Sequence, residues 1–196
     1  GISGTDNLGW MRESTGWLPA LLSLDLCGWN SPTWGPTYTP VVEAAIQNAT
    51  DWWARGGLVS MQFHWKNPQK PDGSAWVGAR GSKPASGPFD MASVTVTGTP
   101  AHEAFMKDLA RHADYLERLA AARVPVLWRP FHEIDGGWFW WTDTATPEHT
   151  AAAWRLMFDY LVRERKLHNL IWVWSAALRA GGYAELLRRE RRAGSR

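Results

Sequence analysis

Short, almost continuously apolar runs that alternate with helical stretches constrain the fold of this chain more than any other feature. The runs have the length of buried strands and occupy residues 18–26, 58–64, 124–131 and 170–174. Helices are predicted between them, at residues 41–55, 101–123 and 146 to about 166. Strands without polar alternation that are separated by helices are typical of a parallel sheet covered on both faces, either a barrel or a doubly wound sheet.

Residues typical of helix starts and loops support this alternation of strands and helices. Thr146, Pro147 and Glu148 supply a cap, a first-turn proline and an acidic residue for the third helix. Residues 66–100 are rich in Pro, Gly, Ser and Lys without a sustained period, which predicts a long loop.

The barrel is the better of the two folds. A nucleotide-binding doubly wound sheet should carry a glycine fingerprint after its first strand, and neither GxGxxG nor GxxxxGK[ST] occurs. A strand end at residues 2–4 would add a fifth strand, while complete barrels use about 250 residues. The sequence therefore predicts an α/β fold, a (β/α)₈ TIM barrel with only about the first five βα units present, in residues 1–175, followed by an Arg-rich tail at 176–196.

Composition excludes several other classes. The 21 Lys and Arg nearly balance the 19 Asp and Glu, which is too even for a nucleic-acid surface. No run approaches the about 18 apolar residues of a membrane span, and the single cysteine, Cys27, cannot form an internal disulfide.

Metal and acyl-transfer motifs are incomplete. His132-Glu133 begins an HExxH zinc motif, but Gly136 stands where the second histidine is needed, and no GxSxG elbow occurs. No spacing supports a metal site, although a scattered set of His64, His132 and Asp135 is the remaining alternative. No metal and no cofactor are predicted.

The strand ends carry the candidate chemistry, because barrel active sites lie at the carboxyl ends of the strands. Asp25, His64, His132-Glu133 and Ser175 follow or close the four runs. Tryptophan is also abundant, with 15 residues, and Trp138, Phe139, Trp140 and Trp141 come just after Glu133. Apolar rings disfavour the ionised form of a nearby carboxyl, which suits a general acid, and their flat faces match the C–H face of a sugar.

The stretch VPVLWRPFHEIDGGWFWW at 124–141 resembles the acid/base strand of glycoside hydrolase family 26, the β-mannanase family. Further segments keep the family's order: SGTDN at 3–7, TGWLPALLSLDL at 15–26, GGLVSMQFHWKNP at 56–68 and NLIWVWS at 169–175. The resemblance covers about nine-tenths of the chain.

The resemblance implies a secreted, retaining endo-hydrolase of β-1,4-mannans with Glu133 as acid/base. A β-1,3-xylanase or lichenase specificity, also found in the family, is the alternative. Residues implied to bind substrate are His64, His132 and Trp138, with Trp65 and Trp76 as weaker candidates. Arg129 matches the motif in a supporting role, and Asp135 stands where the family usually has Asn, whose amide could donate hydrogen bonds that a carboxylate cannot.

The family's nucleophile is not found. A retaining mechanism needs a second carboxylate about 5 to 5.5 Å from the first, which the family places in a stretch resembling SEFG on its seventh strand. Residues 176–196 contain no such stretch. A non-catalytic carbohydrate-binding remnant is therefore the second hypothesis, and an uncovered sheet edge predicts self-association.

Overall fold

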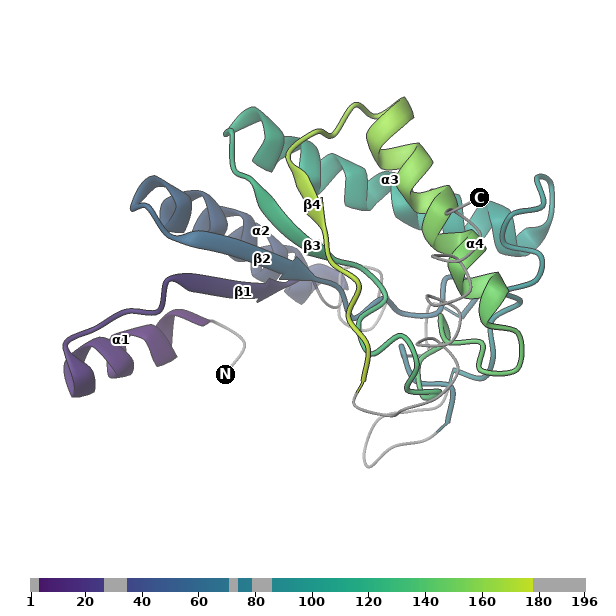
Figure 1. Cartoon of the computed structure of the whole chain (residues 1–196), viewed down its shortest axis with the longest axis horizontal. Helices are drawn as coiled ribbons and strands as arrows, with labels where there is room; N and C mark the ends of the chain where they lie inside the picture. Colours follow the sequence, from purple (N-terminus) through teal and green to yellow (C-terminus); the bar gives the residue numbers. More distant parts are fainter. Residues whose placement is uncertain (1–3, 27–34, 71–73, 79–85, 178–196) are drawn as a thin grey trace, which may run out of the picture.

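The computed structural model describes residues 4–26, 35–70, 74–78 and 86–177 (Figure 1). Its centre is a four-stranded parallel sheet in the order β1-β2-β3-β4. The strands are β1 (Leu21–Asp25), β2 (Leu58–Gln62), β3 (Val126–Arg129) and β4 (Leu170–Trp172). A doubly wound sheet reverses its strand order at a switch point, whereas this sheet runs sequentially, as consecutive strands of a barrel do.

Helices connect the strands and lie against one side of the sheet (Figure 1). They are α2 (Gly35–Ala54), α3 (Pro100–Ala121) and α4 (Pro147–Phe158), the last continued by a π-helical turn, η1 (Asp159–Glu164). These elements confirm the predicted alternation, and the predicted third helix changes its hydrogen-bond pattern at Asp159. A further helix that the sequence did not predict, α1 (Gly4–Thr15), projects from the N-terminal side of β1. The expected strand end at residues 2–4 falls largely outside the described residues, and Gly4 itself begins α1.

Two helix starts illustrate the local physics. Thr99 caps α3 by accepting a hydrogen bond at its hydroxyl from the backbone N–H of His102, at 3.2 Å, with Pro100 in the first turn. The prediction that Thr146 caps α4 is wrong, because its side chain makes no cap hydrogen bond. The Asp143 carboxylate instead accepts from the backbone N–H of Thr146 at 2.8 Å and of Ala145 at 3.1 Å.

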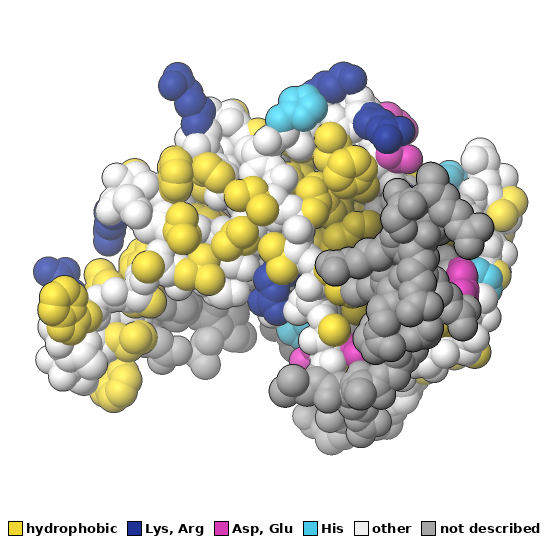
Figure 2. Space-filling model, viewed as in Figure 1, with side chains coloured by type: hydrophobic (Ala, Val, Ile, Leu, Met, Phe, Trp, Pro, Cys, Tyr) yellow, Lys and Arg dark blue, Asp and Glu magenta, His cyan; other side chains and the backbone are white. Residues whose placement is uncertain are grey.

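The two sheet faces differ in burial. Residues that face the helices are buried: Leu22, Leu24, Val59, Met61, Val126 and Trp128. On the other face Leu21, Leu58 and Ile171 are 43%, 52% and 55% exposed, and Figure 2 shows apolar side chains gathered over the strands there. The expectation of a sheet covered on both faces is therefore met on one face only within the described part of the chain. The open face corresponds to the interior of a barrel.

Strand register places one polar row at the carboxyl end of this open face. Asp25 is the register partner of Gln62, and Gln62 is the register partner of Arg129. Since side chains alternate along a strand, these three residues share the face of Leu21 and Leu58. The loops that follow β2 and β3 begin directly beyond this row.

Candidate active site

The chain turns sharply after β3. Phe131 and Glu133 both have positive φ angles, 51° and 53°, a region that costs a non-glycine residue on the order of 1–3 kcal/mol. Phe131 is 2% exposed and packs against Trp65, Trp140 and Trp141, with ring centroids 6.1 to 6.2 Å away. Burial of these large rings offsets the backbone strain and thereby fixes where Glu133 leaves the sheet.

Glu133 is partly exposed, and Trp138 holds its carboxylate. The indole Nε1–H of Trp138 donates to Oε2 of Glu133 at 2.7 Å. The indole lies directly over Gly136, where an added Cβ would come within 2.4 Å of the ring. Glycine at this position is therefore required for the contact between Trp138 and Glu133.

Two histidines from neighbouring strand ends meet beside Glu133. Nε2 of His64, after β2, lies 3.1 Å from Nε2 of His132, after β3, and their ring centroids are 4.3 Å apart. Phe139 contacts both rings, at 5.6 and 5.1 Å. Trp141 also donates its Nε1–H to the backbone carbonyl of His132 at 3.1 Å. His132 is 3% exposed, whereas the His64 side chain keeps 36% of its surface exposed.

Asp25 anchors this pair from β1. Its carboxylate lies 2.5 Å from Nδ1 of His64 and accepts from the His64 backbone N–H and from Nε2 of Gln62, both at 3.1 Å. Burial raises the pKa of Asp25, but the hydrogen bonds and the charge of His64 outweigh it, so the pKa is lowered overall. Burial lowers the pKa of His132 to about 4; the charges of His64 and Arg129 lower it further, and Asp25 opposes them.

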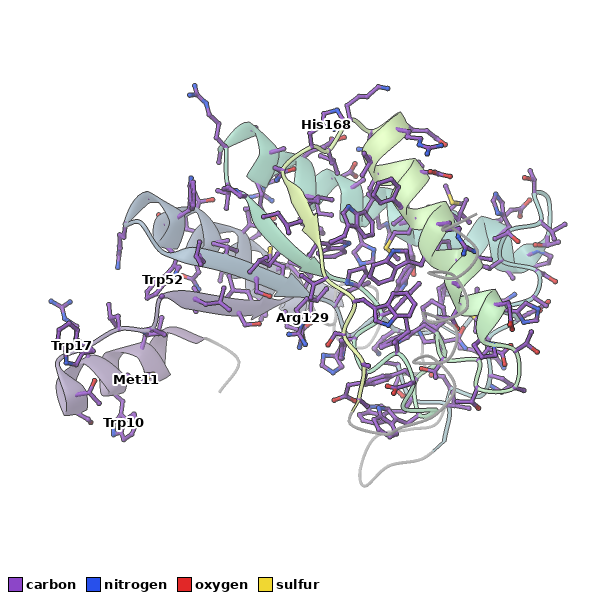
Figure 3. All side chains as sticks on the ribbon, viewed as in Figure 1. Trp10, Met11, Trp17, Trp52, Arg129 and His168 are labelled. Carbon is purple, nitrogen blue, oxygen red and sulfur yellow. The ribbon has the colours of Figure 1, made fainter. Side chains whose placement is uncertain are left out.

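Arg129 links the end of β2 to the segment after β4. Its guanidinium donates to Oε1 of Gln62 at 3.1 Å and to Oγ of Ser175 at 3.0 Å. Figure 3 places it at the carboxyl end of the sheet, between β2 and the segment after β4. Asp135 has a comparable bracing position, since its carboxylate accepts the backbone N–H of Ala177 at 2.5 Å.

Trp65 does not reach the site, and its candidacy for sugar binding is corrected. It is 2% exposed, its ring centroid lies 4.8 Å from that of Phe105, and it donates its Nε1–H to Asp108 of α3 at 3.0 Å. Successive residues on extended chain point to opposite faces, so His64 faces the mouth while Trp65 faces the helix. A ring buried on all sides offers no surface to a sugar.

Trp76 lies beside the loop that carries Trp138. The short segment 74–78 is hydrogen-bonded to residues 138 and 140, through Val77 N–H to Trp138 O at 2.8 Å and Trp140 N–H to Ala75 O at 3.0 Å. The ring of Trp76 packs 4.6 Å from that of Phe139. Among the predicted residues, the structure therefore brings together Glu133, Trp138, Trp76, His64 and His132.

Sequence reasoning placed Asp25 at a strand end but missed its bond to His64. It gave Gln62 no role, and it considered Gly136 only as the position where a zinc motif fails. Strand alternation could have grouped Asp25, Gln62 and Arg129, because each lies on the same face at the end of its strand. Among the described residues no group of three His, Cys, Asp or Glu side chains is arranged to hold a metal ion, and no described helix is long and apolar enough to cross a membrane.

Comparison with known proteins decides the family, because the sequence model of glycosyl hydrolase family 26 matches residues 2–180. The chain belongs to glycosyl hydrolase family 26. A mannan endo-1,4-β-mannosidase of Thermothelomyces thermophilus is 36% identical over 183 residues, which are 89% of this chain and 36% of that protein. Mannan endo-1,4-β-mannosidase B of a Piromyces species is 33% identical over 167 residues, 83% of this chain and 27% of that protein.

Solved family 26 structures show the same fold. The β-mannanase of a symbiotic protist of the termite Reticulitermes speratus, complexed with gluco-manno-oligosaccharide, superposes with a TM-score of 0.78 at 33% identity, covering 92% of this chain and 55% of that one. The Podospora anserina GH26-CBM35 β-(1,4)-mannanase gives 0.71 at 32% identity, covering 86% of this chain and 38% of that one. The barrel prediction is thereby confirmed, and the chain spans about a third of these curated relatives and about half of the protist enzyme.

Proposed function

We propose that this chain carries the acid/base side of a retaining endo-β-1,4-mannanase site. Glu133 protonates the glycosidic oxygen between two β-1,4-linked mannose units as the C1–O bond breaks, and afterwards accepts a proton from the attacking water. The observation that carries the proposal is the carboxylate of Glu133 at the carboxyl end of β3, held 2.7 Å from the Nε1–H of Trp138. The family membership and the mannanase relatives support it.

The surrounding groups fit a pyranose substrate. Trp138 and Trp76 are only partly buried and bring aromatic faces to the loop beside Glu133. The exposed edge of His64 adds a polar group on the neighbouring strand end. Rings of this kind stack on the C–H face of a sugar, while the polar groups set its orientation.

The test isolates the role of Glu133 from that of the second carboxylate. Residues 176–196 contain no stretch like the family's nucleophile segment, so sodium azide is added as an external nucleophile together with mannohexaose. Azide then attacks C1, the C1–O bond breaks, and the proton of Glu133 goes to the departing sugar oxygen, which releases an α-mannosyl azide.

We expect azide-dependent product from the wild-type chain, a loss of at least about 100-fold in Glu133→Gln, and little reducing-sugar release from galactomannan without azide. Trp138→Phe keeps a ring but removes the Nε1–H and should fall between the two. Equal product from wild type and Glu133→Gln would contradict the proposal.

A non-catalytic carbohydrate-binding protein is the second candidate, because the partly buried rings of Trp76 and Trp138 could bind a sugar without any bond being broken. Mannohexaose binding without azide product would support this candidate. Competition by β-1,3-xylo-oligosaccharides or mixed-linkage glucans, measured by calorimetry against mannohexaose, would indicate one of the other specificities of the family.

A further inference from the structure

A continuous polar chain links the first strand to the residue before Glu133. Asp25 lies 2.5 Å from Nδ1 of His64, and Nε2 of His64 lies 3.1 Å from Nε2 of His132. Three consecutive strands thus contribute one group each at the same end of the sheet. Neither the acid/base role of Glu133 nor the contact of Trp138 accounts for Asp25.

The number of ring protons available fixes the direction of the hydrogen bonds from Asp25 through His64 to His132. An ionised carboxylate has only lone pairs, and Asp25 already accepts from the His64 backbone and from Gln62, so Nδ1 of His64 must donate. When both imidazoles are neutral, each carries one ring proton. Nε2 of His64 then holds a lone pair, and the contact requires the proton of His132 to sit on its Nε2.

The placement of the buried His132 ring depends on which of its nitrogens carries the proton. Its Nδ1 is buried and has no hydrogen-bond partner among the described residues. Within the described part of the chain, the contact with His64 is therefore the one polar contact that restrains the ring, which otherwise packs against Phe139 and Trp141, with Arg129 as the nearby cation. If Nε2 of His132 did not carry the proton, its hydrogen bond to His64 would be lost, and the ring would be held by its apolar contacts.

We propose that Asp25 is a positioning residue, which sets the Nδ1–H form of His64 and through it the Nε2–H form and the placement of His132 beside Glu133. This inference rests on the proposed function only for its effect on sugar binding. The proton order itself is a property of the free protein.

The first measurement is the ring-proton form of each histidine, from long-range ¹H–¹⁵N correlation spectra of the whole chain at pH 8, where histidines of ordinary pKa are neutral. We expect Nδ1–H for His64 and Nε2–H for His132. In Asp25→Asn the amide can both donate and accept, so both histidines should become mixtures of the two forms. An Nε2–H form of His64 in the wild type would overturn the proposal, as would an unchanged His132 in folded Asp25→Asn.

Asp143→Asn is the matched control. Asp143 also bonds a histidine at Nδ1, that of His149 at 2.8 Å, but within the described residues no second histidine bonds to His149. This variant should alter the signals of His149 and leave those of His64 and His132 unchanged. Should Asp25→Asn not fold, His64→Phe keeps a ring but removes the acceptor, and an unchanged His132 in that variant would equally overturn the proposal.

The second measurement is mannohexaose affinity by calorimetry. We expect Asp25→Asn to weaken binding by about tenfold, the range for losing one charge-assisted hydrogen bond, with Asp143→Asn unchanged. If the wild type binds no mannohexaose, the proposed function fails while the spectra still decide the proton order. If the wild type binds and Asp25→Asn binds equally well, the positioning role is wrong.

Discussion

At the scale of single residues, the sequence predicts several residues of the site but not all the contacts that hold their side chains. Glu133, His132 and Trp138 could be predicted from one motif, because RPFHE and GGWFWW are adjacent in the chain. The link from Asp25 to His64 could not, because it joins residues 39 positions apart through strand register. The exclusion of Trp65 from the site likewise depended on which face of the chain it occupies after β2.

Gly136 offers a direct test of how Trp138 is held. A methyl group there would come within 2.4 Å of the indole, so Gly136→Ala must displace the ring and break its bond to Glu133. We expect a loss of stability of about 1–3 kcal/mol and weaker mannohexaose binding, measured by urea unfolding and calorimetry. Gly9→Ala in α1 is the control, since an added Cβ there meets nothing within 4 Å; equal effects of the two substitutions would contradict the prediction.

His132 should make stability depend on pH. Its pKa is about 4 in the folded chain and about 6.5 when unfolded, so between these values the unfolded state binds the extra proton. Stability from this group is present above pH 6.5 and is lost as the pH falls toward 4, by about 2 kcal/mol between pH 7 and pH 5. Buried His112, whose pKa burial lowers well below the usual value, acts in the same direction.

Urea unfolding at the two pH values checks this. His132→Gln should show a shallower dependence than the wild type, while His168→Gln, at an exposed position (Figure 3), controls for the substitution itself. Equal pH dependence in the wild type and His132→Gln would show that the buried imidazole does not carry the effect.

At the scale of helices and strands, prediction succeeded where burial requires apolar residues at regular spacing or in continuous runs. The apolar stripe of α3 (Phe105, Leu109, Leu116 and Leu119) is fully buried, and the four apolar runs all contain strands. It failed at details of hydrogen bonding, which short polar side chains decide locally. Helix α1 was missed because its sequence, GTDNLGWMREST, contains two glycines and presents a weak apolar face.

A threonine precedes both α3 and α4, but only the one before α3, Thr99, caps its helix with a side-chain hydrogen bond. Thr99→Ala removes the acceptor for His102 N–H and should lower the free energy of unfolding by about 1 kcal/mol. Thr146→Ala should change it by less than about 0.5 kcal/mol, because Asp143 accepts the N–H groups there. Thermal or urea unfolding of both variants tests the difference, and a larger loss in Thr146→Ala would refute it.

At the scale of the whole molecule, the described residues form a half-barrel with one apolar face uncovered. Leu58 and Ile171 are each more than half exposed on that face. Exposed apolar surface next to unpaired strand edges favours association. We therefore expect the apparent size in size-exclusion chromatography to grow with protein concentration.

Lysines on the open face should suppress this growth. The double variant Leu58→Lys with Ile171→Lys should elute at a constant, smaller size, whereas Val96→Lys should behave as the wild type, because Val96 is equally exposed but lies outside the sheet. A wild-type chain that stays monomeric at all concentrations would rule out association through this face.

The hydrogen bonds around the loop after β3 have a consequence for how family 26 barrels can change. Ile134 N–H bonds to Ser175 O at 3.2 Å, Asp135 accepts from Ala177, and the 74–78 segment bonds to residues 138 and 140. Among the described residues, these supports for the loop that carries Glu133 come from sequence that ends just past β4. Evolution or an engineer could therefore exchange the later strands of a family 26 barrel and inherit the loop that holds Glu133 already in place.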